Sequence, residues 1–390
     1  MNVLVVNAGS STLKYQVIDT KSHKVSAKGS CERVCFTGGT FTHAANGSKK
    51  VTENIEFPDH KVAIEVVLKD LEANGVKIEG IGHRIVQGGW YFGDSSLVDE
   101  DVLAKIREVA PLAPLHNNPE ANVIEYCLEQ YPDLPNVTVY DTAFHFNMPE
   151  VAKTYALPKD VCDKLHIRKY GAHGTSYRYI SKKVAEMTNG EARKVVVCHI
   201  GSGASLCAIE DGKCMDTTMG LTPLDGVMMG TRCGDLDPSV VNYLKYTLNI
   251  TGHELDEILN KKSGLLGISG VSSDKRDVEE AALHGNKRAQ LASDMLNYQI
   301  KKTIGSYIAA MGGVDAIVFT GGIGEHDAAA RAKICHHMDW LGIRIDTEKN
   351  KHPVGDVCEI TAWGAKVRTL VIATDEELMI ARDTKEVLEK

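Results

Sequence analysis

Three short glycine-rich segments follow apolar runs, and each has the composition of a phosphate-binding turn. They lie at residues 7–12 (NAGSST), 201–203 (GSG) and 320–325 (TGGIGE). Small side chains let a ligand approach the backbone, where successive N–H groups bind anions. Lys14 adds a cation beside the first segment. Ordinary turns use the same residue types, so each segment alone leaves both interpretations open.

The first two segments belong to a repeated pattern. Residues 3–19 and 195–216 each consist of an apolar run, a small-residue turn and a second strand-like run, and Gly201 follows Gly9 by 192 residues. The glycine loop of a Rossmann site opens a helix, whereas both loops here lead into a strand. The repeat predicts two related halves, with one phosphate-binding loop in each.

Charged and histidine residues recur in glycine-flanked or strand-end segments, where functional loops are common. Arg84 and Arg232 both lie between glycines, and a planar guanidinium binds carboxylate or phosphate in a bidentate manner. His116, Asp141 and His173 stand in similar segments. Each residue alone is compatible with a structural role or an ion pair. Together with the turns, they form the set of groups that phosphoryl transfer requires.

Two further segments add polar groups to this set. Residues 272–276 (SSDKR) offer a carboxylate and a guanidinium for a ribose or a base. Residues 374–377 (TDEE) follow an apolar run and offer a carboxylate ligand for magnesium.

Hydrophobic periodicity predicts the elements that must position these residues. We expect strands at 3–6, 24–29, 81–86, 137–140, 316–319 and 370–372. We expect helices at 61–73 and 119–130, the second opened by Pro119 in its first turn. A longer helix carries a core stripe and ends at Gly312; the stripe consists of Leu296, Ile300, Ile304 and Ile308.

Length and composition limit the classes of protein. A chain of 390 residues is long enough for two domains, and we place the change near residue 150. A net charge of −8 disfavours nucleic acid and anionic membranes as partners, and no apolar run is long enough to span a bilayer. The ten cysteines include no C-x-x-C pair. With no leader pattern at the start, we expect a cytoplasmic protein. Because Cys198, Cys207 and Cys358 lie in apolar, strand-like surroundings, we expect buried thiols rather than disulfides.

The assembled motifs resemble those of the acetate kinases. The segments VLVVNAGSSTLKYQVID, GHRIV, APLHN, DTAFH, RKYG, MGTRCGDLDP, FTGGIGE and TDEEL occur in the family's order from Val3 to Glu377. The resemblance implies an α/β fold of two ribonuclease-H-like (actin-like ATPase) domains with an interdomain cleft. It places them at residues 1–150, completed by a helix at 377–390, and at 151–376.

The resemblance also implies a reaction and roles for individual residues. It implies reversible, magnesium-dependent transfer of the ATP γ-phosphoryl to acetate, giving acetyl phosphate and ADP, with Mn²⁺ as a possible substitute and a homodimer as the assembly. Asn7 and Glu376 match metal-associated positions, and Asp141, His173, Arg232, Arg84 and His116 match catalytic positions. The apolar acetate pocket would consist of Val86, Leu115, Ala172 and Pro223 around Arg84. The nucleotide would contact Lys14, His199, Ile200, Gly201, Ser202, Gly203, Asp274, Lys275, Arg276, Gly322, Ile323, Gly324, Glu325 and His326.

Asp141 matches a residue often described as a proton donor or acceptor, yet the chemistry favours another role. A carboxylate substrate is already an anion at neutral pH, so no proton must be removed before it attacks. We therefore expect Asp141 to orient the metal or an arginine.

Four positions depart from the family pattern. Ala172 stands where many members have Phe, which predicts a larger pocket and better use of propionate. Ser202 replaces a common Asn, Gln87 a frequent His, and Asn118 a usual Pro. Gly322 keeps the small residue that leaves room for adenine, which favours ATP over pyrophosphate as the donor.

Two alternatives stay open at this point. A propionate or other short-chain acyl kinase would differ only in its pocket. A non-enzymatic, nucleotide-gated module of the actin or Hsp70 type would share the fold, but it would not require the substrate-side charges of Arg84, His116, His173 and Arg232.

Overall fold

A computed structural model describes residues 1–390, and its contacts divide the chain into two compact units. Unit 1 comprises residues 1–146, 174–176 and 375–390, and unit 2 comprises residues 147–173 and 177–374. These units are defined by contacts within the structure. Whether the chain divides into domains at residues 150 and 377 stays a prediction.

Unit 1 is built on an 8-stranded sheet in the order β5-β4-β3-β2-β1-β6-β8-β7. Its strands are β1 (Asn2–Ala8), β2 (Thr12–Asp19), β3 (Val25–Glu32), β4 (Thr40–Ala45), β5 (Val51–Asn54), β6 (Gly80–Ile85), β7 (Ser96–Leu97) and β8 (Asn136–Tyr140). Its helices are α1 (His60–Ala73), α2 (Glu100–Val109), α3 (Pro114–Gln130) and α15 (Glu376–Leu388), with short 3₁₀ turns at Ala110–Leu112 and Ala143–His145.

Unit 2 contains a 6-stranded sheet in the order β11-β10-β9-β12-β14-β13. Its strands are β9 (Lys194–Ile200), β10 (Ala204–Glu210), β11 (Lys213–Thr217), β12 (Ala316–Thr320), β13 (Val357–Glu359) and β14 (Arg368–Ile372). Its helices are α4 (Glu150–Lys153), α5 (Lys159–Leu165), α6 (Gly174–Thr188, whose first turn belongs to unit 1), α7 (Pro238–Leu248), α8 (Gly252–Lys261), α9 (Gly264–Ser269), α10 (Lys275–Leu283), α11 (Lys287–Met311), α12 (Gly321–His326), α13 (Ala328–Cys335) and α14 (Thr347–Lys351), with a 3₁₀ turn at Asp339–Leu341.

The two sheets share one plan, which agrees with the expected α/β fold of two related halves. β1 pairs antiparallel with β2 and parallel with β6, and β9 pairs antiparallel with β10 and parallel with β12. The next strands, β8 and β14, are also parallel. β8 and β12 are buried along their whole length, as strands covered on both faces must be.

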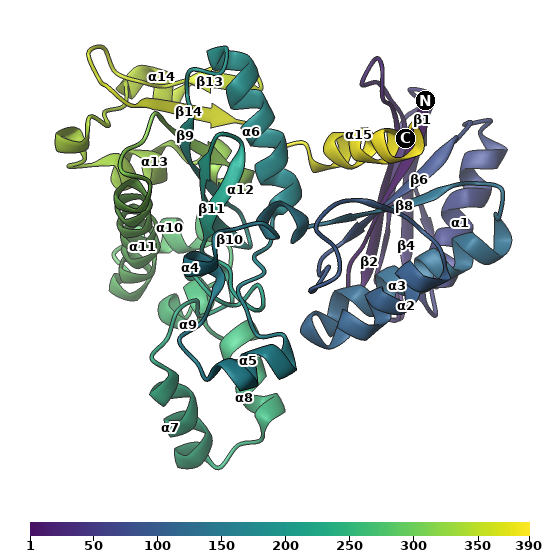
Figure 1. The fold of residues 1–390 in the computed structure, drawn as a ribbon, viewed down its shortest axis with the longest axis horizontal. Coiled ribbons are helices and arrows are strands. Elements are labelled where there is room, and N and C mark those ends of the chain that lie inside the picture. Colours follow the sequence, from purple (N-terminus) through teal and green to yellow (C-terminus); the bar gives the residue numbers. More distant parts are fainter. The chain divides into compact units, whose positions relative to one another are not determined.

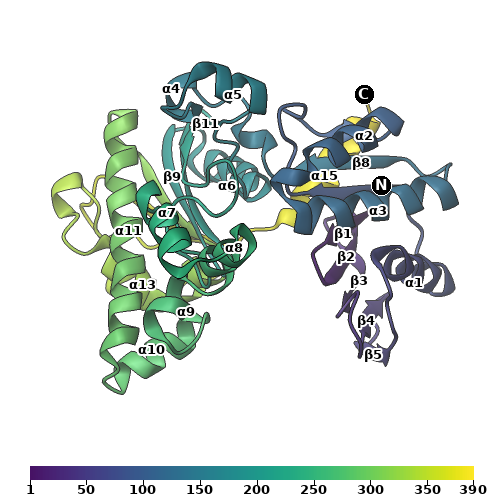
Figure 2. The ribbon, with the colours of Figure 1, turned by 90° about the horizontal axis from the view of Figure 1, so that it is seen from below.

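Helix positions follow the apolar stripes, with one correction. The long helix α11 carries the expected core stripe, ends at Gly312 and packs beside α9 and α10 (Figure 2). The prediction that Pro119 opens a helix is wrong, because α3 begins at Pro114 and contains Pro119 in its interior. Pro119 removes one backbone donor, and the Asn118 side chain donates to the Pro114 carbonyl nearby.

All ten cysteines are free thiols, and six of them are buried. Cys198 and Cys207 are buried as expected, whereas Cys358 is half-buried and Cys35 is exposed. The expectation of buried thiols is therefore confirmed at Cys198 and Cys207 and only partly met at Cys358. No helix of the structure is long and apolar enough to cross a membrane.

Helix α15 returns from the end of the chain to pack against β1, β6 and β8 of unit 1 (Figure 1). Gly82 on β6 makes this packing possible. A Cβ at residue 82 would lie 2.3 Å from Thr384 Oγ1 and 2.9 Å from Ile380 Cγ2, both on α15. The N-terminus of α15 can therefore lie close to the ends of the parallel strands.

Replacing Gly82 with alanine should lower the free energy of unfolding by about 1–3 kcal/mol, the usual cost of overpacking. Gly305→Ala on α11 is the matched control. A Cβ there meets nothing within 4 Å, so this variant should gain up to about 1 kcal/mol from helix propensity. Urea unfolding measures both variants, and a Gly82→Ala protein as stable as the parent would contradict the packing argument.

Candidate functional site

The predicted site residues of unit 1 lie at the carboxyl ends of three adjacent parallel strands. Asn7 is near the end of β1, Arg84 is near the end of β6, and Asp141 directly follows β8. Because the strands are parallel and neighbouring, these ends meet at one edge of the sheet, where open α/β sheets bind ligands.

Arg84 is the centre of this group. Its Nη2 donates to Asp141 Oδ2 at 2.6 Å, its Nε donates to Asp141 Oδ1 at 3.3 Å, and its Nη1 donates to Asn7 Oδ1 at 3.1 Å. Burial alone would lower the pKa of Arg84, but the carboxylates of Asp141 and Glu376 outweigh it and raise the pKa above its usual value. Thr175 Oγ1 donates to Asp141 Oδ1 at 3.3 Å, which holds the acceptor from a further segment.

Glu376 supplies another carboxyl group from the first turn of α15. Burial raises its pKa to about 7, with Arg84 opposing the shift and Asp141 adding to it. Its buried Oε1 has no hydrogen-bond partner. A buried oxygen without a partner, together with the Asn7 amide oxygen, offers the hard oxygen ligands that Mg²⁺ and Mn²⁺ prefer. The residues therefore fit a divalent cation.

The segment after Arg84 is held by side chains instead of by a strand partner. Four successive backbone N–H groups each donate to a side-chain oxygen. The N–H groups are those of Val86, Gln87, Gly88 and Gly89, and the acceptors are Glu120 (3.3 Å), Asn117 Oδ1 (3.2 Å), Thr142 Oγ1 (3.0 Å) and Gln87 Oε1 (2.9 Å). This satisfies the amides of a buried loop and fixes the position of Val86. Glu120 was not predicted from the sequence.

The other predicted residues of unit 1 lie around this edge. Lys14 is the direct cross-strand neighbour of Asn7, and both line one cavity of about 460 Å³. Leu115 and His116 occupy the first turn of α3, with Leu115 exposed and His116 half-buried.

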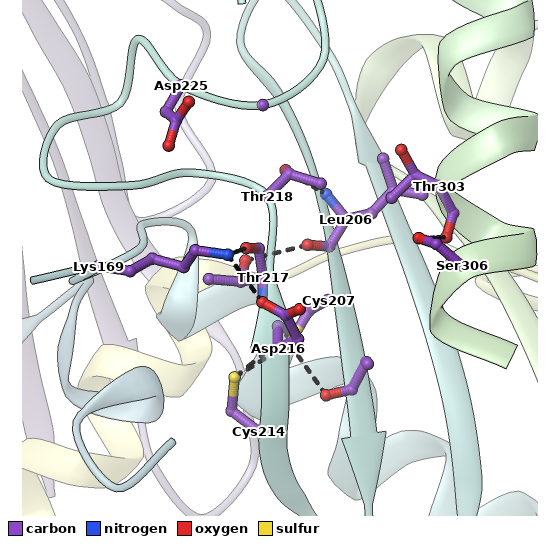
Figure 3. A network of polar contacts seen from close by, with 12 residues as sticks. Lys169, Leu206, Cys207, Cys214, Asp216, Thr217, Thr218, Asp225, Thr303 and Ser306 are labelled. Atoms are coloured by element: carbon purple, nitrogen blue, oxygen red, sulfur yellow. Dashed lines mark hydrogen bonds and ion pairs between the residues drawn. The ribbon is translucent and has the colours of Figure 1, made fainter. Parts of the chain in front are cut away.

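In unit 2, the segment that leads to His173 is anchored at two points. Lys169 Nζ donates to Asp216 Oδ1 and to the Thr217 carbonyl, both at 2.9 Å (Figure 3). The N–H groups of Tyr170 and Gly171 donate to the Gly220 carbonyl. Ala172, the next residue, packs in the apolar core of unit 2, where it is 3% exposed.

His173 has an unusual backbone and a defined side-chain partner. It precedes α6 with φ at 56°, in the left-handed region, which non-glycine residues seldom adopt. Its Nδ1 lies 2.8 Å from Ser205 Oγ, and Ser205 Oγ also contacts the Tyr177 hydroxyl. The His173 ring stacks on that of His199 with centroids 4.2 Å apart. Ser205, which no sequence motif indicated, fixes the ring orientation.

Arg232 lies beside His173 in unit 2. A Cβ at Gly203 would lie 3.5 Å from His173 Nε2 and 3.8 Å from Arg232 Nη1, so both groups surround the bare backbone of the second glycine turn. Arg232 donates to the Pro223 carbonyl at 3.0 Å, and no carboxylate contributes to its electrostatic surroundings. Burial lowers its pKa. A half-buried guanidinium without a counter-charge is suited to binding an anion.

Three of the segments predicted to bind nucleotide line a single cavity of about 590 Å³ in unit 2. They contribute Gly201, Ser202, Asp274, Lys275, Arg276, Gly322, Ile323 and His326, and the wall is completed by Ser273, Glu279, Asp327 and Ala328. Gly322 faces open space, since a Cβ there meets nothing within 4 Å. The cavity is not lined by the neighbouring predicted residues His199, Ile200, Gly203, Gly324 and Glu325.

The cations of this cavity already have partners. The Lys275 side chain is buried, and its Nζ contacts both Glu279 and Asp327. Arg276 pairs with Asp274, which also caps α10 by accepting the Arg276 N–H. The cavity wall is thus rich in paired charges, which suits the polar edge of a base or a ribose better than a chain of phosphates.

Arg331 forms hydrogen bonds with the backbone of the third glycine-rich segment. It was not predicted from the sequence. It is 1% exposed, and its Nη1 donates to the carbonyls of Gly324 and Glu325 at 2.8 and 2.9 Å. Its Nε and Nη2 donate to Asn350. The guanidinium therefore satisfies the last carbonyls of α12 and fixes the wall of the cavity.

The structure thus places the predicted residues in two separate groups. Unit 1 contains Asn7, Lys14, Arg84, Val86, Leu115, His116, Asp141 and Glu376, and all other predicted residues belong to unit 2. The acetate pocket expected from Val86, Leu115, Ala172 and Pro223 draws on both groups and stays a prediction.

Comparison with known proteins places this geometry in a family. Acetate kinases of Clostridium botulinum and Clostridium acetobutylicum are 49% and 50% identical to the chain, with full coverage of both chains. The crystal structure of Porphyromonas gingivalis acetate kinase matches with a TM-score of 0.93 at 41% identity, and that of a propionate kinase from Francisella tularensis matches with 0.94 at 40%, each covering 99% of both chains. Because the model of the acetokinase family also matches residues 2–382, the chain belongs to the acetokinase family.

Proposed function

We propose that this protein transfers the γ-phosphoryl group of ATP to acetate, giving acetyl phosphate and ADP, in a reversible reaction. The observation that carries the proposal is the full-length similarity to acetate kinases at 49–50% identity. Arg84 and Arg232, two arginines at ligand-facing strand ends and turns, supply the charges that a carboxylate and a phosphoryl group need.

Unit 1 binds the acceptor through Arg84. Its guanidinium is held by two oxygens of Asp141 and by Asn7, so it keeps one orientation. Acetate is ionised at neutral pH and attacks without losing a proton. Asp141 therefore acts by orienting Arg84 and needs no role as a base. Val86, fixed by its N–H bond, forms part of the apolar surface for the methyl group.

A divalent cation, Mg²⁺ or Mn²⁺, would be held by Asn7 and by the unpartnered Oε1 of Glu376. When bound, such an ion neutralises phosphate charge. Lys14, the cross-strand neighbour of Asn7, adds a positive charge for the phosphate chain.

Unit 2 binds the nucleotide and stabilises the transferring group. The cavity of about 590 Å³ holds the nucleoside, and the bare turn at residues 201–203 admits phosphate. His173 and Arg232 beside that turn stabilise the charge that develops on the phosphoryl oxygens. His116 contributes from α3 of unit 1 as a further active-site residue.

We also infer a homodimer in the cytoplasm. Helix α7 supports the dimer, because it buries none of its residues although Tyr243, Tyr246 and Leu248 are apolar and at least half exposed. A second copy of the chain would cover this face. Ten free thiols are typical of a reducing compartment. Light scattering of the protein measures its mass, and a monomer would refute the dimer.

The enzymatic function is tested by trapping acetyl phosphate with hydroxylamine. The purified protein is mixed with ATP, magnesium and a series of short carboxylates, and we expect acetohydroxamate to form with acetate. If none of the carboxylates gives a hydroxamate, the kinase function is refuted and a nucleotide-gated module of the actin type is favoured.

Asp141→Asn is the variant that separates orientation from proton transfer. We expect a loss of activity of at least a hundredfold, because Arg84 loses a charged partner, with the shape of the pH profile unchanged. Loss of only one limb of the profile would instead indicate that Asp141 transfers a proton.

Ala172→Phe tests the choice between acetate and propionate. If the missing ring leaves room for a longer acid, the parent protein should use propionate well, and the variant should lower the ratio of kcat/KM for propionate over acetate. One methylene contributes about 0.8 kcal/mol, roughly a fourfold change. Because Ala172 packs in the core, the Tm is measured alongside. An unchanged ratio in a folded variant would exclude this position as the determinant.

Gly322→Tyr tests the nucleotide cavity. The new ring projects from a residue that lines the cavity and has open space around it. We expect the KM for ATP to rise at least tenfold while the KM for acetate stays within twofold. Gly305→Tyr, at an equally open glycine on α11, is the control and should leave both values unchanged. Normal ATP kinetics in the Gly322 variant would place the nucleotide elsewhere.

A further inference from the structure

Glu120 is a buried carboxyl group for which the reaction described above has no use. It lies on α3, is 2% exposed, and is four residues after His116, so both occupy the same face of the helix. Both of its oxygens lie 3.3 Å from the Val86 N–H. A buried carboxyl group is costly, so a folded protein retains one where it satisfies a specific partner.

Glu120 is the only ionisable group among the four side chains that hold the segment after Arg84. Asn117, Thr142 and Gln87 hold the next three N–H groups, and Asn117 Nδ2 also donates to the Gln87 carbonyl at 2.8 Å. Val86 is the first residue of this segment and follows Arg84 by two positions. The position of Val86 relative to the guanidinium is therefore set by the contact with α3.

Arg84 and Glu120 influence each other's pKa. The carboxyl groups of Asp141, Glu376 and Glu120 all lie near enough to Arg84 to raise the pKa of its guanidinium. Burial raises the pKa of Glu120 well above its usual value, although Arg84 and the Val86 N–H act in the opposite direction. A carboxyl group accepts the Val86 hydrogen bond whether or not it carries a proton, so the contact does not depend on a negative charge at residue 120.

We propose that Glu120 is a positioning residue for the carboxylate substrate, which acts by accepting the Val86 N–H and so fixing the substrate-facing backbone next to Arg84. It does not touch the reacting atoms. The inference rests on the proposed function, because it assigns the acceptor carboxylate to Arg84. Its specific consequence is that acetate binding depends on a hydrogen-bond acceptor at residue 120 and not on a negative charge there.

Three variants separate the acceptor from the charge. Glu120→Gln keeps an acceptor oxygen at the same length without a charge, and we expect the KM for acetate within threefold of the parent. Glu120→Met keeps the length without an acceptor, and Glu120→Asp keeps the charge on a side chain too short to reach Val86. For both we expect the KM for acetate to rise at least tenfold, with the KM for ATP within twofold.

Glu125→Gln is the matched control. Glu125 lies on the same helix but is partly exposed and pairs with Lys61 and Arg107 at the surface. We expect its acetate and ATP kinetics to equal those of the parent. The Tm of every variant is measured, and Glu120→Asp carries the test if Glu120→Met does not fold.

Two results would overturn the proposal. An unchanged KM for acetate in folded Glu120→Met or Glu120→Asp would mean that the contact has no positioning role. A Glu120→Gln protein as impaired as Glu120→Met would mean that the charge, not the acceptor, matters. Failure of the proposed function is separate, since the parent protein would then form no acetohydroxamate before any variant is made.

Discussion

The ion pair between Arg84 and Asp141 is the interaction on which the arrangement of unit 1 depends. It joins the ends of two neighbouring parallel strands, and its guanidinium also reaches Asn7 on a third. Removing one partner of such a buried pair costs about 3–5 kcal/mol, because the other charge is left without compensation. The pair persists because a bidentate contact and further donors satisfy its remaining polar atoms.

Several other buried polar side chains hold backbone segments of the site in place. Glu120, Asn117 and Thr142 hold consecutive amides after Arg84, and in unit 2 Arg331 holds the carbonyls at the end of α12. In each case a side chain forms a hydrogen bond with backbone groups that have no partner within a helix or a sheet. The same logic places His173, whose left-handed backbone is retained between an anchored segment and the first turn of α6.

Two glycines lie next to functional segments, one in each unit. Gly82 lets α15 approach β6 and so carries Glu376 to the strand ends. Gly203 leaves bare backbone beside His173 and Arg232. At Gly82 a Cβ would clash with α15, so the constraint there is steric and local, whereas a Cβ at Gly203 would meet its neighbours only at ordinary van der Waals distances.

The sequence by itself determined the class of fold and most of the chemical groups. Continuous apolar runs mark β1 and β9, a stripe of apolar residues four apart marks α11, and the ordered motifs identify Arg84, Asp141 and Arg232, because hydrophobicity and residue type are properties of the local sequence. Only the tertiary structure showed that Glu120, Ser205 and Arg331 hold site segments, that Lys275 is already paired, and that α3 begins before Pro119. Those facts depend on contacts between residues far apart in sequence, and no local pattern encodes the partner of a buried polar group.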